Sequence, residues 1–216
     1  MIHIHKLNIA TPEAADVAKI FDMKKLRWKR IKNVNWKNYP YKPAVLVRMA
    51  HNGESIFIEF DVTEASVASV AGVDNGRVWE DSCCEFFCMP SQDGIYYNFE
   101  CNCTGQLLIG CGQQRENRQL APQAILDQVS RWSSLGNKPF AERIEPTHWR
   151  LAMVIPVRAF FMHDLEDLSG RKLLVNLYKC GDKLQRPHFL SFFPIETEKP
   201  DFHRPDFFQP IRLEKR

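Results

Sequence analysis

Short segments in which hydrophobic and polar residues alternate make up most of the chain. Residues 44–50 and 55–62 show this alternation and flank His51-Asn52-Gly53-Glu54, where Asn-Gly is a strong signal for a hairpin turn. Many short strands joined by turns are typical of two packed antiparallel sheets. The sequence therefore predicts an all-β fold, a two-sheet antiparallel β-sandwich of the jelly-roll or immunoglobulin-like kind. Further strands are predicted at residues 2–7, 83–89, 95–103, 106–111, 148–155, 172–180 and 188–193.

One short helix is predicted near the N-terminus. It begins at Thr11, whose hydroxyl is a favourable N-cap, with Pro12 at the first helical position and Glu13 in the first turn. The face of this helix that is expected to be buried carries Val17, Ile20 and Phe21.

No repeat, low-complexity tract or linker divides the sequence, so residues 1–216 are expected to form a single domain. The stretch 113–146 has the weakest pattern. We expect it to form long loops, with one further strand or short helix around residues 125–132.

Composition narrows the classes of partner. A net charge of +3 over 216 residues is too small to indicate a nucleic-acid or membrane partner, and no apolar run approaches the roughly 20 residues that span a bilayer.

The seven cysteines are odd in number and form no C-x-x-C pair, which argues against a structural zinc site or a closed disulfide framework and favours a reducing compartment. The alternating N-terminus does not resemble an export signal. We therefore expect a cytoplasmic protein, or a periplasmic or secreted one if a signal has been removed.

Strand periodicity sorts residues 83–89 and 95–103 onto two faces. It directs the adjacent Cys83 and Cys84 to opposite faces, so neither a disulfide between them nor a metal that they share is expected. The hydrophobic side of 95–103 is a core face, on which cysteines act as small buried hydrophobic residues. The other side is a row of hydrogen-bonding groups that needs water or a ligand as its partner: Tyr96, Asn98, Glu100 and Asn102.

Trp79 and Glu85 are the first candidates for a binding site. A tryptophan ring can stack on the C–H groups of a sugar, and a carboxylate can accept charge-assisted hydrogen bonds from sugar hydroxyls. The polar row would add amides and a further carboxylate. The alternative is a half-buried tryptophan beside a solvated glutamate, with the polar row facing water.

Other kinds of chemistry remain open at this level. Glu85 and Glu100 allow glycoside hydrolysis, which needs two carboxylates about 5–9 Å apart across the scissile bond. The basic, aromatic stretch 27–43 fits a solvated loop better than a nucleic-acid surface. Asp61 and Glu64 offer oxygen ligands for a calcium ion, although their segment matches no recognised calcium loop.

The order of several motifs resembles carbohydrate-binding module family 9, in particular its stand-alone bacterial members. The resemblance runs from about residue 30 to the C-terminus. It implies a β-sandwich that binds glucose-type or xylose-type sugars, often at chain ends, between two stacking aromatic rings. Relatives are commonly attached to xylanases and often bind structural calcium. The motifs are VWEDSCCEFF, YYNFECNCTG, WRLAMVIPV, LLVNLYKCGD, LSFFPI and KPDFHRPDFF.

The resemblance also implies roles for individual residues. Trp79 matches the first stacking tryptophan and Glu85 the carboxylate that follows it. Phe192 stands where relatives tend to have the second stacking tryptophan, and a phenyl ring offers less area and a weaker quadrupole than indole. The polar contacts would come from Asn98, Glu100 and Asn102 on one strand and Asn176 on a later one.

The sequence thus predicts a protein that binds a mono- or oligosaccharide in a cleft, in the context of polysaccharide breakdown. It would bind rather than cleave. It would require no cofactor, and structural calcium is an optional addition. The alternatives are a xylanase-like hydrolase and a sandwich that has lost sugar binding and serves as an interaction module. The oligomeric state stays open.

Overall fold

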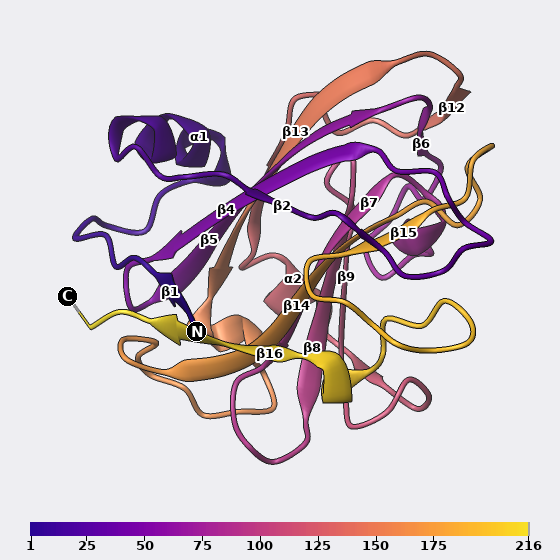
Figure 1. The fold of residues 1–216 in the computed structure, drawn as a ribbon. Helices are drawn as coiled ribbons and strands as arrows, with labels where there is room; N and C mark the ends of the chain where they lie inside the picture. The colour runs from indigo at the N-terminus through magenta and orange to yellow at the C-terminus, as the bar shows by residue number, and fades with distance from the viewer. Residues whose placement is uncertain (216) are drawn as a thin grey trace.

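Two β-sheets packed face to face form the body of the protein in the computed structural model, which describes residues 1–215 (Figure 1). The larger sheet has nine strands in the order β1-β16-β14-β7-β8-β9-β10, with β15 beside β14 and β3 beside β15. Its strands are β1 (Ile2–Ile4), β3 (Asn33–Val34), β7 (Cys83–Met89), β8 (Tyr96–Asn102), β9 (Leu107–Gly112), β10 (Gln119–Leu120), β14 (Lys172–Cys180), β15 (Phe189–Ser191) and β16 (Gln209–Leu213).

The smaller sheet has five strands in the order β11-β13-β5-β4-β2, and β6 pairs with β12 in a separate ribbon. These strands are β2 (Lys29–Arg30), β4 (Ala44–His51), β5 (Ser55–Glu64), β6 (Val67–Ser69), β11 (Ser130–Ser133), β12 (Phe140–Arg143) and β13 (Thr147–Pro156). Every pairing between named strands is antiparallel except that of β1 with β16. The predicted all-β, two-sheet antiparallel sandwich is confirmed.

The main core lies between the two sheets. Its side chains come from the inner faces of β4, β5 and β13 in the smaller sheet and of β7, β8, β9 and β14 in the larger one. In β7 and β8 the inward residues follow the predicted alternation, with Cys84, Phe86 and Cys88 on β7 and Tyr97, Phe99 and Cys101 on β8. All seven cysteines are buried as free thiols.

Helix α1 (Ala14–Met23) covers the outer face of the smaller sheet, where its Val17 and Phe21 pack against Phe57, Ala152 and other residues of that face. The predicted helix start at Thr11 is wrong. The N-cap is Glu13, and the Oγ of Ser130 on β11 accepts a hydrogen bond from the backbone N–H of Ala14. Thr11 is not free to cap, because its hydroxyl bonds to residues of the β4–β5 hairpin loop, Asn52 and Glu54.

The weakly patterned stretch 113–146 contains strands β10, β11 and β12 and a second helix, α2 (Gln123–Leu126). One further strand or short helix is predicted around residues 125–132, and the structure has both there, α2 and β11. The long loops predicted for the rest of the stretch are partly replaced by β10 and β12. Within residues 1–215, no helix has the length and apolar character needed to cross a membrane.

The outer face of the larger sheet is also covered, and the candidate site described below lies on this face. A C-terminal segment, defined here as residues 195–208, lies over this face and contributes Ile195, Phe202 and Phe208 to a second hydrophobic cluster. The Phe202 ring stacks on that of Tyr178 on β14, with 4.0 Å between ring centroids. The polar row on β8 therefore faces this cover and the space that it leaves open, not bulk water.

Candidate functional site

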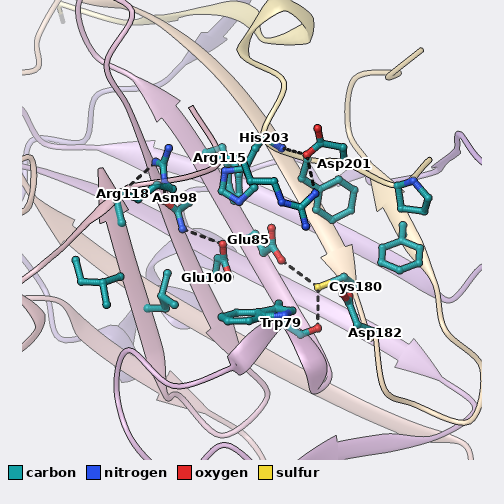
Figure 2. Close-up of a pocket in the computed structure, with 17 residues that line it drawn as sticks. Trp79, Glu85, Asn98, Glu100, Arg115, Arg118, Cys180, Asp182, Asp201 and His203 are labelled. Atoms are coloured by element: carbon teal, nitrogen blue, oxygen red, sulfur yellow. Dashed lines mark hydrogen bonds and ion pairs between the residues drawn. The ribbon is translucent and has the colours of Figure 1, made fainter. Parts of the chain in front are cut away.

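A cleft with a volume of about 320 Å³ opens on the outer face of the larger sheet (Figure 2). Its floor consists of side chains from the adjacent strands β14, β7, β8 and β9. Its walls come from a 3-10 turn at Val78–Glu80, from the loop that follows β9 and from the C-terminal segment. Segments far apart in sequence thus meet around one opening.

Two carboxyl groups lie side by side on the floor. Glu85 on β7 and Glu100 on β8 are directly opposite each other in the strand register, and only 2% and 5% of their surfaces are exposed. Glu100 Oε1 accepts a hydrogen bond from Asn98 Nδ2 at 2.9 Å, and Glu85 Oε1 lies 3.0 Å from the thiol of Cys180. We call Glu85 and Glu100 the carboxyl pair.

The environment of the carboxyl pair favours protonation. Burial raises the pKa of Glu85 well above its ordinary value, and repulsion from Glu100 raises it further. Burial also raises the pKa of Glu100, to about 7, although the hydrogen bond from Asn98 opposes this change. The neighbouring Asp182 is raised to about 6, chiefly by burial. The floor therefore presents hydrogen-bond acceptors, and its surroundings favour the protonated form of the carboxyl pair.

Trp79 forms one wall. It sits in the 3-10 turn that precedes β7 and is half-buried, so part of its indole ring faces the opening (Figure 2). Two further aromatic residues, Phe189 and Phe202, line the cleft from β15 and the C-terminal segment. The cleft thus has aromatic surface on more than one side.

The opposite wall is basic and tightly organised. Arg118 donates hydrogen bonds to Asn98 Oδ1 and to the Tyr96 carbonyl, both at 2.8 Å, and its guanidinium lies 4.1 Å from the Tyr96 ring centroid. The Tyr96 hydroxyl bonds to Nδ1 of His203 at 2.9 Å. Burial lowers the pKa of His203 to about 3, so the imidazole is neutral. Arg118 is already held by protein groups and serves to orient Asn98.

An ion pair joins the two walls at the rim. Arg115 Nη1, from the loop that follows β9, lies 3.3 Å from Asp201 Oδ1 in the C-terminal segment. Local sequence patterns do not identify Arg115, Arg118 or His203 as site residues. The two arginines lie in the stretch without periodicity, and His203 belongs to a loop motif whose position over β8 depends on the tertiary fold.

The structure brings together four of the predicted site residues, Trp79, Glu85, Asn98 and Glu100. Tyr96 lies at the edge of this group, beneath Arg118 and His203. Asn102 does not line the cleft. Its side-chain amide donates to Ser69 and Asp81, and its carbonyl accepts from backbone N–H groups of the β8–β9 turn.

Asn176 and Phe192 also lie outside the cleft. The Asn176 side chain exchanges hydrogen bonds with the backbone of Phe193 and so fixes the chain after β15 against β14. Phe192 is packed against the main core, with its ring 4.8 Å from that of Phe193. In this structure, Phe189 and Phe202 supply the additional aromatic surface that the sequence analysis expected from Phe192.

The predicted calcium ligands are not brought together. Asp61 and Glu64 are three residues apart on β5, so their side chains emerge on opposite faces of the strand. Asp61 lies 3.0 Å from His148 Nε2. Glu64 accepts a hydrogen bond from Trp149 Nε1 at 2.7 Å and pairs with Lys179 at 2.8 Å. These two residues do not fit a shared calcium ion.

Comparisons with known proteins point to one family. The chain matches the family model described as carbohydrate-binding family 9 over residues 15–213. It is similar to the crystal structure of a protein from Bacteroides uniformis ATCC 8492 that is provisionally described as carbohydrate-binding. The identity is 50% and the TM-score 0.97, with 99% of this chain and 98% of that chain covered. No curated protein gives a significant match.

Two structures of a family 9 module from Caldicellulosiruptor kristjanssonii share the fold. The structure in complex with cellotriose is 10% identical, with a TM-score of 0.61, and the match covers all of this chain and 94% of that one. The structure in complex with glucose is 11% identical, with a TM-score of 0.58, and the match covers all of this chain and 96% of that one. Because the family model spans nearly the whole chain, this protein belongs to carbohydrate-binding family 9.

Proposed function

We propose that the cleft binds a small gluco- or xylo-saccharide, held at the end of its chain. The observation that carries this proposal is the placement of the carboxyl pair beside the partly exposed ring of Trp79. An apolar ring next to oriented acceptors suits a sugar, which has C–H groups on its faces and hydroxyls around its edge. The glucose and cellotriose complexes of the Caldicellulosiruptor module support a ligand of this class.

The size of the cleft favours a short ligand. A volume of about 320 Å³ is at the small end of the range of about 300–1,000 Å³ that is typical of ligand pockets. The Arg115–Asp201 ion pair also closes the rim on one side. Both features favour a terminal sugar over the middle of a long chain.

The carboxyl pair is also the feature that a glycoside hydrolase would need. A hydrolase places its two carboxyl groups on either side of the scissile bond, so that they flank the bound sugar. Here both groups rise from neighbouring positions on one sheet face, beneath the ligand space. This arrangement supports binding without cleavage, in which the pair offers hydrogen bonds to adjacent hydroxyls.

Calorimetric titration with glucose, xylose, cellobiose and xylobiose tests the proposal. We expect at least one of these sugars to bind, and Trp79→Ala to weaken that binding by at least about tenfold, equivalent to about 1.4 kcal/mol. Phe192→Leu is the matched control, since it alters an aromatic ring outside the cleft, and it should leave the affinity unchanged. Reducing-end assays on the same mixtures should detect no cleavage of the disaccharides.

The alternatives give other results. Heat of binding that depends on Phe192 and not on Trp79 would move the site to the far side of β14. Release of reducing ends that Glu85→Gln abolishes would identify a hydrolase. If none of the four sugars binds, the protein is an interaction module that has kept the fold and lost the ligand.

A further inference from the structure

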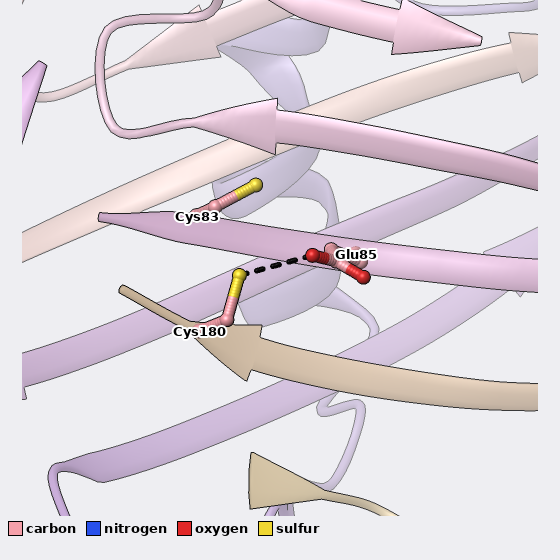
Figure 3. Close-up of side chains that lie close together, drawn as sticks. All are labelled: Cys83, Glu85 and Cys180. Atoms are coloured by element: carbon pink, nitrogen blue, oxygen red, sulfur yellow. Dashed lines mark hydrogen bonds between the residues drawn. The ribbon is translucent and has the colours of Figure 1, made fainter. Parts of the chain in front are cut away.

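Two thiols and a carboxyl group lie close together, two of them at the floor of the cleft and one behind it (Figure 3). Cys83 on β7 and Cys180 on β14 are directly paired in the strand register, and Glu85 follows two residues after Cys83 on the same face. One ligand atom of each side chain lies within 4.8 Å of the other two. We propose that Cys83, Glu85 and Cys180 bind a thiophilic divalent cation, with Zn²⁺ as the best fit.

The donor set selects the class of metal. Zinc accepts sulfur and oxygen ligands in a tetrahedron, with bonds of about 2.3 Å to thiolate and 2.0–2.2 Å to carboxylate, so its ligand atoms stand about 3.5–3.8 Å apart. Cys180 Sγ and Glu85 Oε1 are 3.0 Å apart, and all three ligand atoms lie within 4.8 Å of one another, so their separations are close to those that zinc requires. Calcium prefers six to eight oxygen ligands, which these residues cannot supply.

The electrostatics of the floor independently favour a cation. Among residues 1–215, no lysine, arginine or histidine forms an ion pair with Glu85, Glu100 or Asp182. Arg118 attracts Glu100 through space and Lys179 attracts Glu85, but Arg118 is held by Asn98 and the Tyr96 carbonyl, and Lys179 by Glu64. The buried Glu85 and Glu100 therefore have no directly paired counter-ion, and a divalent ion would stabilise their ionised forms.

The cleft provides the path of entry and the fourth coordination position. Glu85 and Cys180 line the cleft, whereas Cys83 lies fully buried behind them. An ion that enters from the cleft would meet Glu85 and Cys180 first and then recruit Cys83. Binding releases a proton from each thiol, because the thiolate is the ligand. The fourth position then faces the cleft, where a water molecule or a ligand hydroxyl oxygen can fill it.

Local sequence patterns do not reveal this metal site, because its ligands come from two strands that are far apart in sequence. Alternation correctly separates Cys83 from Cys84, but it says nothing about the partner strand. That partner brings Cys180 to Cys83 through the pairing of β7 with β14. A three-ligand site made from one strand and its neighbour has no C-x-x-C signature.

Cobalt titration of the reduced, metal-free protein tests the proposal. We expect one equivalent of Co²⁺ to give the near-ultraviolet charge-transfer band of thiolate ligation together with the visible bands of a tetrahedral site, and Zn²⁺ to displace it. Cys83→Ser and Cys180→Ser should each weaken zinc binding by more than about 100-fold, since even outer partners of a metal site are worth 10–100-fold. Cys84→Ser is the matched control, and its affinity should stay within a few-fold of wild type.

Circular dichroism and cooperative thermal unfolding establish which variants fold. If Cys83→Ser does not fold, Cys180→Ser and the wild-type cobalt spectrum decide the question, because a thiolate band of undiminished intensity and unchanged cobalt affinity in Cys180→Ser contradicts the proposed site. The proposal is overturned if wild type shows no thiolate-to-cobalt band, or if Cys84→Ser loses as much affinity as Cys180→Ser. Neither outcome depends on sugar binding, so the saccharide proposal stands or falls separately.

Discussion

At the scale of single residues, the position of a carboxyl group in the fold decides how readily it ionises. Glu85 and Glu100 are charged residues in strands, and the sequence leaves open whether they meet water or a ligand. In the structure, they are buried next to each other under a loop cover. Their chemistry follows from that neighbourhood, because burial and like charge both oppose ionisation.

The raised pKa of Glu100 predicts a pH-dependent stability. Its ordinary value is 4.5 and its folded value about 7. Below pH 4.5, Glu100 is protonated in both the folded and the unfolded protein, so its contribution to the free energy of unfolding is fully present. As the pH rises from 4.5 through 7, Glu100 loses its proton in the unfolded protein before it does so in the folded protein. Ionisation therefore stabilises the unfolded protein, and the contribution of Glu100 to the free energy of unfolding is lost. Glu100→Gln should therefore gain stability relative to wild type between pH 5 and pH 8, by on the order of 2 kcal/mol.

Urea unfolding at pH 5 and pH 8 measures this difference. Glu116→Gln is a suitable control, because Glu116 is exposed in the loop that follows β9. Its stability relative to wild type should not change between the two pH values. Equal stability changes for both variants would show that Glu100 ionises normally in the folded protein.

At the scale of elements, the period of two predicts most of the strands and their inward faces. It succeeds because a strand with one face in the core must alternate, as β7 and β8 do. It cannot predict the order of strands or what covers an outer face, because these depend on contacts such as Cys83 with Cys180 that are remote in sequence. That Trp79 and Glu85 lie close together was predictable because one short motif contains both, whereas the position of Arg118 and His203 beside them was not.

An ion pair between the two sheets has a testable role. Lys179 on β14 is fully buried and reaches across the core to Glu64 on β5, 2.8 Å away. Burial lowers the pKa of Lys179, but the Glu64 carboxylate and other neighbouring groups outweigh this effect and raise it overall. Lys179→Met should destabilise the protein by about 3–5 kcal/mol, because it leaves a buried carboxylate without its partner.

Chemical denaturation at pH 7 tests this role. Adding Glu64→Gln to Lys179→Met should recover part of the lost stability, since a neutral amide can still accept from Trp149. The control is Lys183→Met, which changes an exposed lysine and should shift stability by no more than about 0.5 kcal/mol. A loss below about 1 kcal/mol for Lys179→Met would mean that the pair does not tie the sheets together.

At the scale of the whole molecule, the cleft joins parts of the chain that are far apart in sequence. The turn before β7, the loop after β9, the end of β14 and the C-terminal segment all contribute to its lining. A ligand that contacts several of these parts binds the folded state and not the unfolded chain. Ligand binding and global stability should therefore be linked.

Thermal unfolding with the tightest-binding of the four sugars checks this linkage. At a concentration of 100 Kd, the free energy of unfolding should rise by about 2.7 kcal/mol. For a chain of this length, that rise corresponds to an increase in Tm of about 5–10 °C. Trp79→Ala at the same sugar concentration should show a much smaller increase. A saturating sugar that leaves Tm unchanged would mean that the folded state is not its receptor.

The parallel pairing of β1 with β16 has a consequence for synthesis. In the larger sheet β16 lies between β1 and β14, so Ile2–Ile4 at the N-terminal end depend on Gln209–Leu213 for their strand partner. A ribosome makes the chain from the N-terminus, and long-range pairings of this kind form slowly. β1 is therefore made long before its partner β16, and until β16 pairs with it, the unpaired edge of β1 is available to chaperones or to other nascent chains.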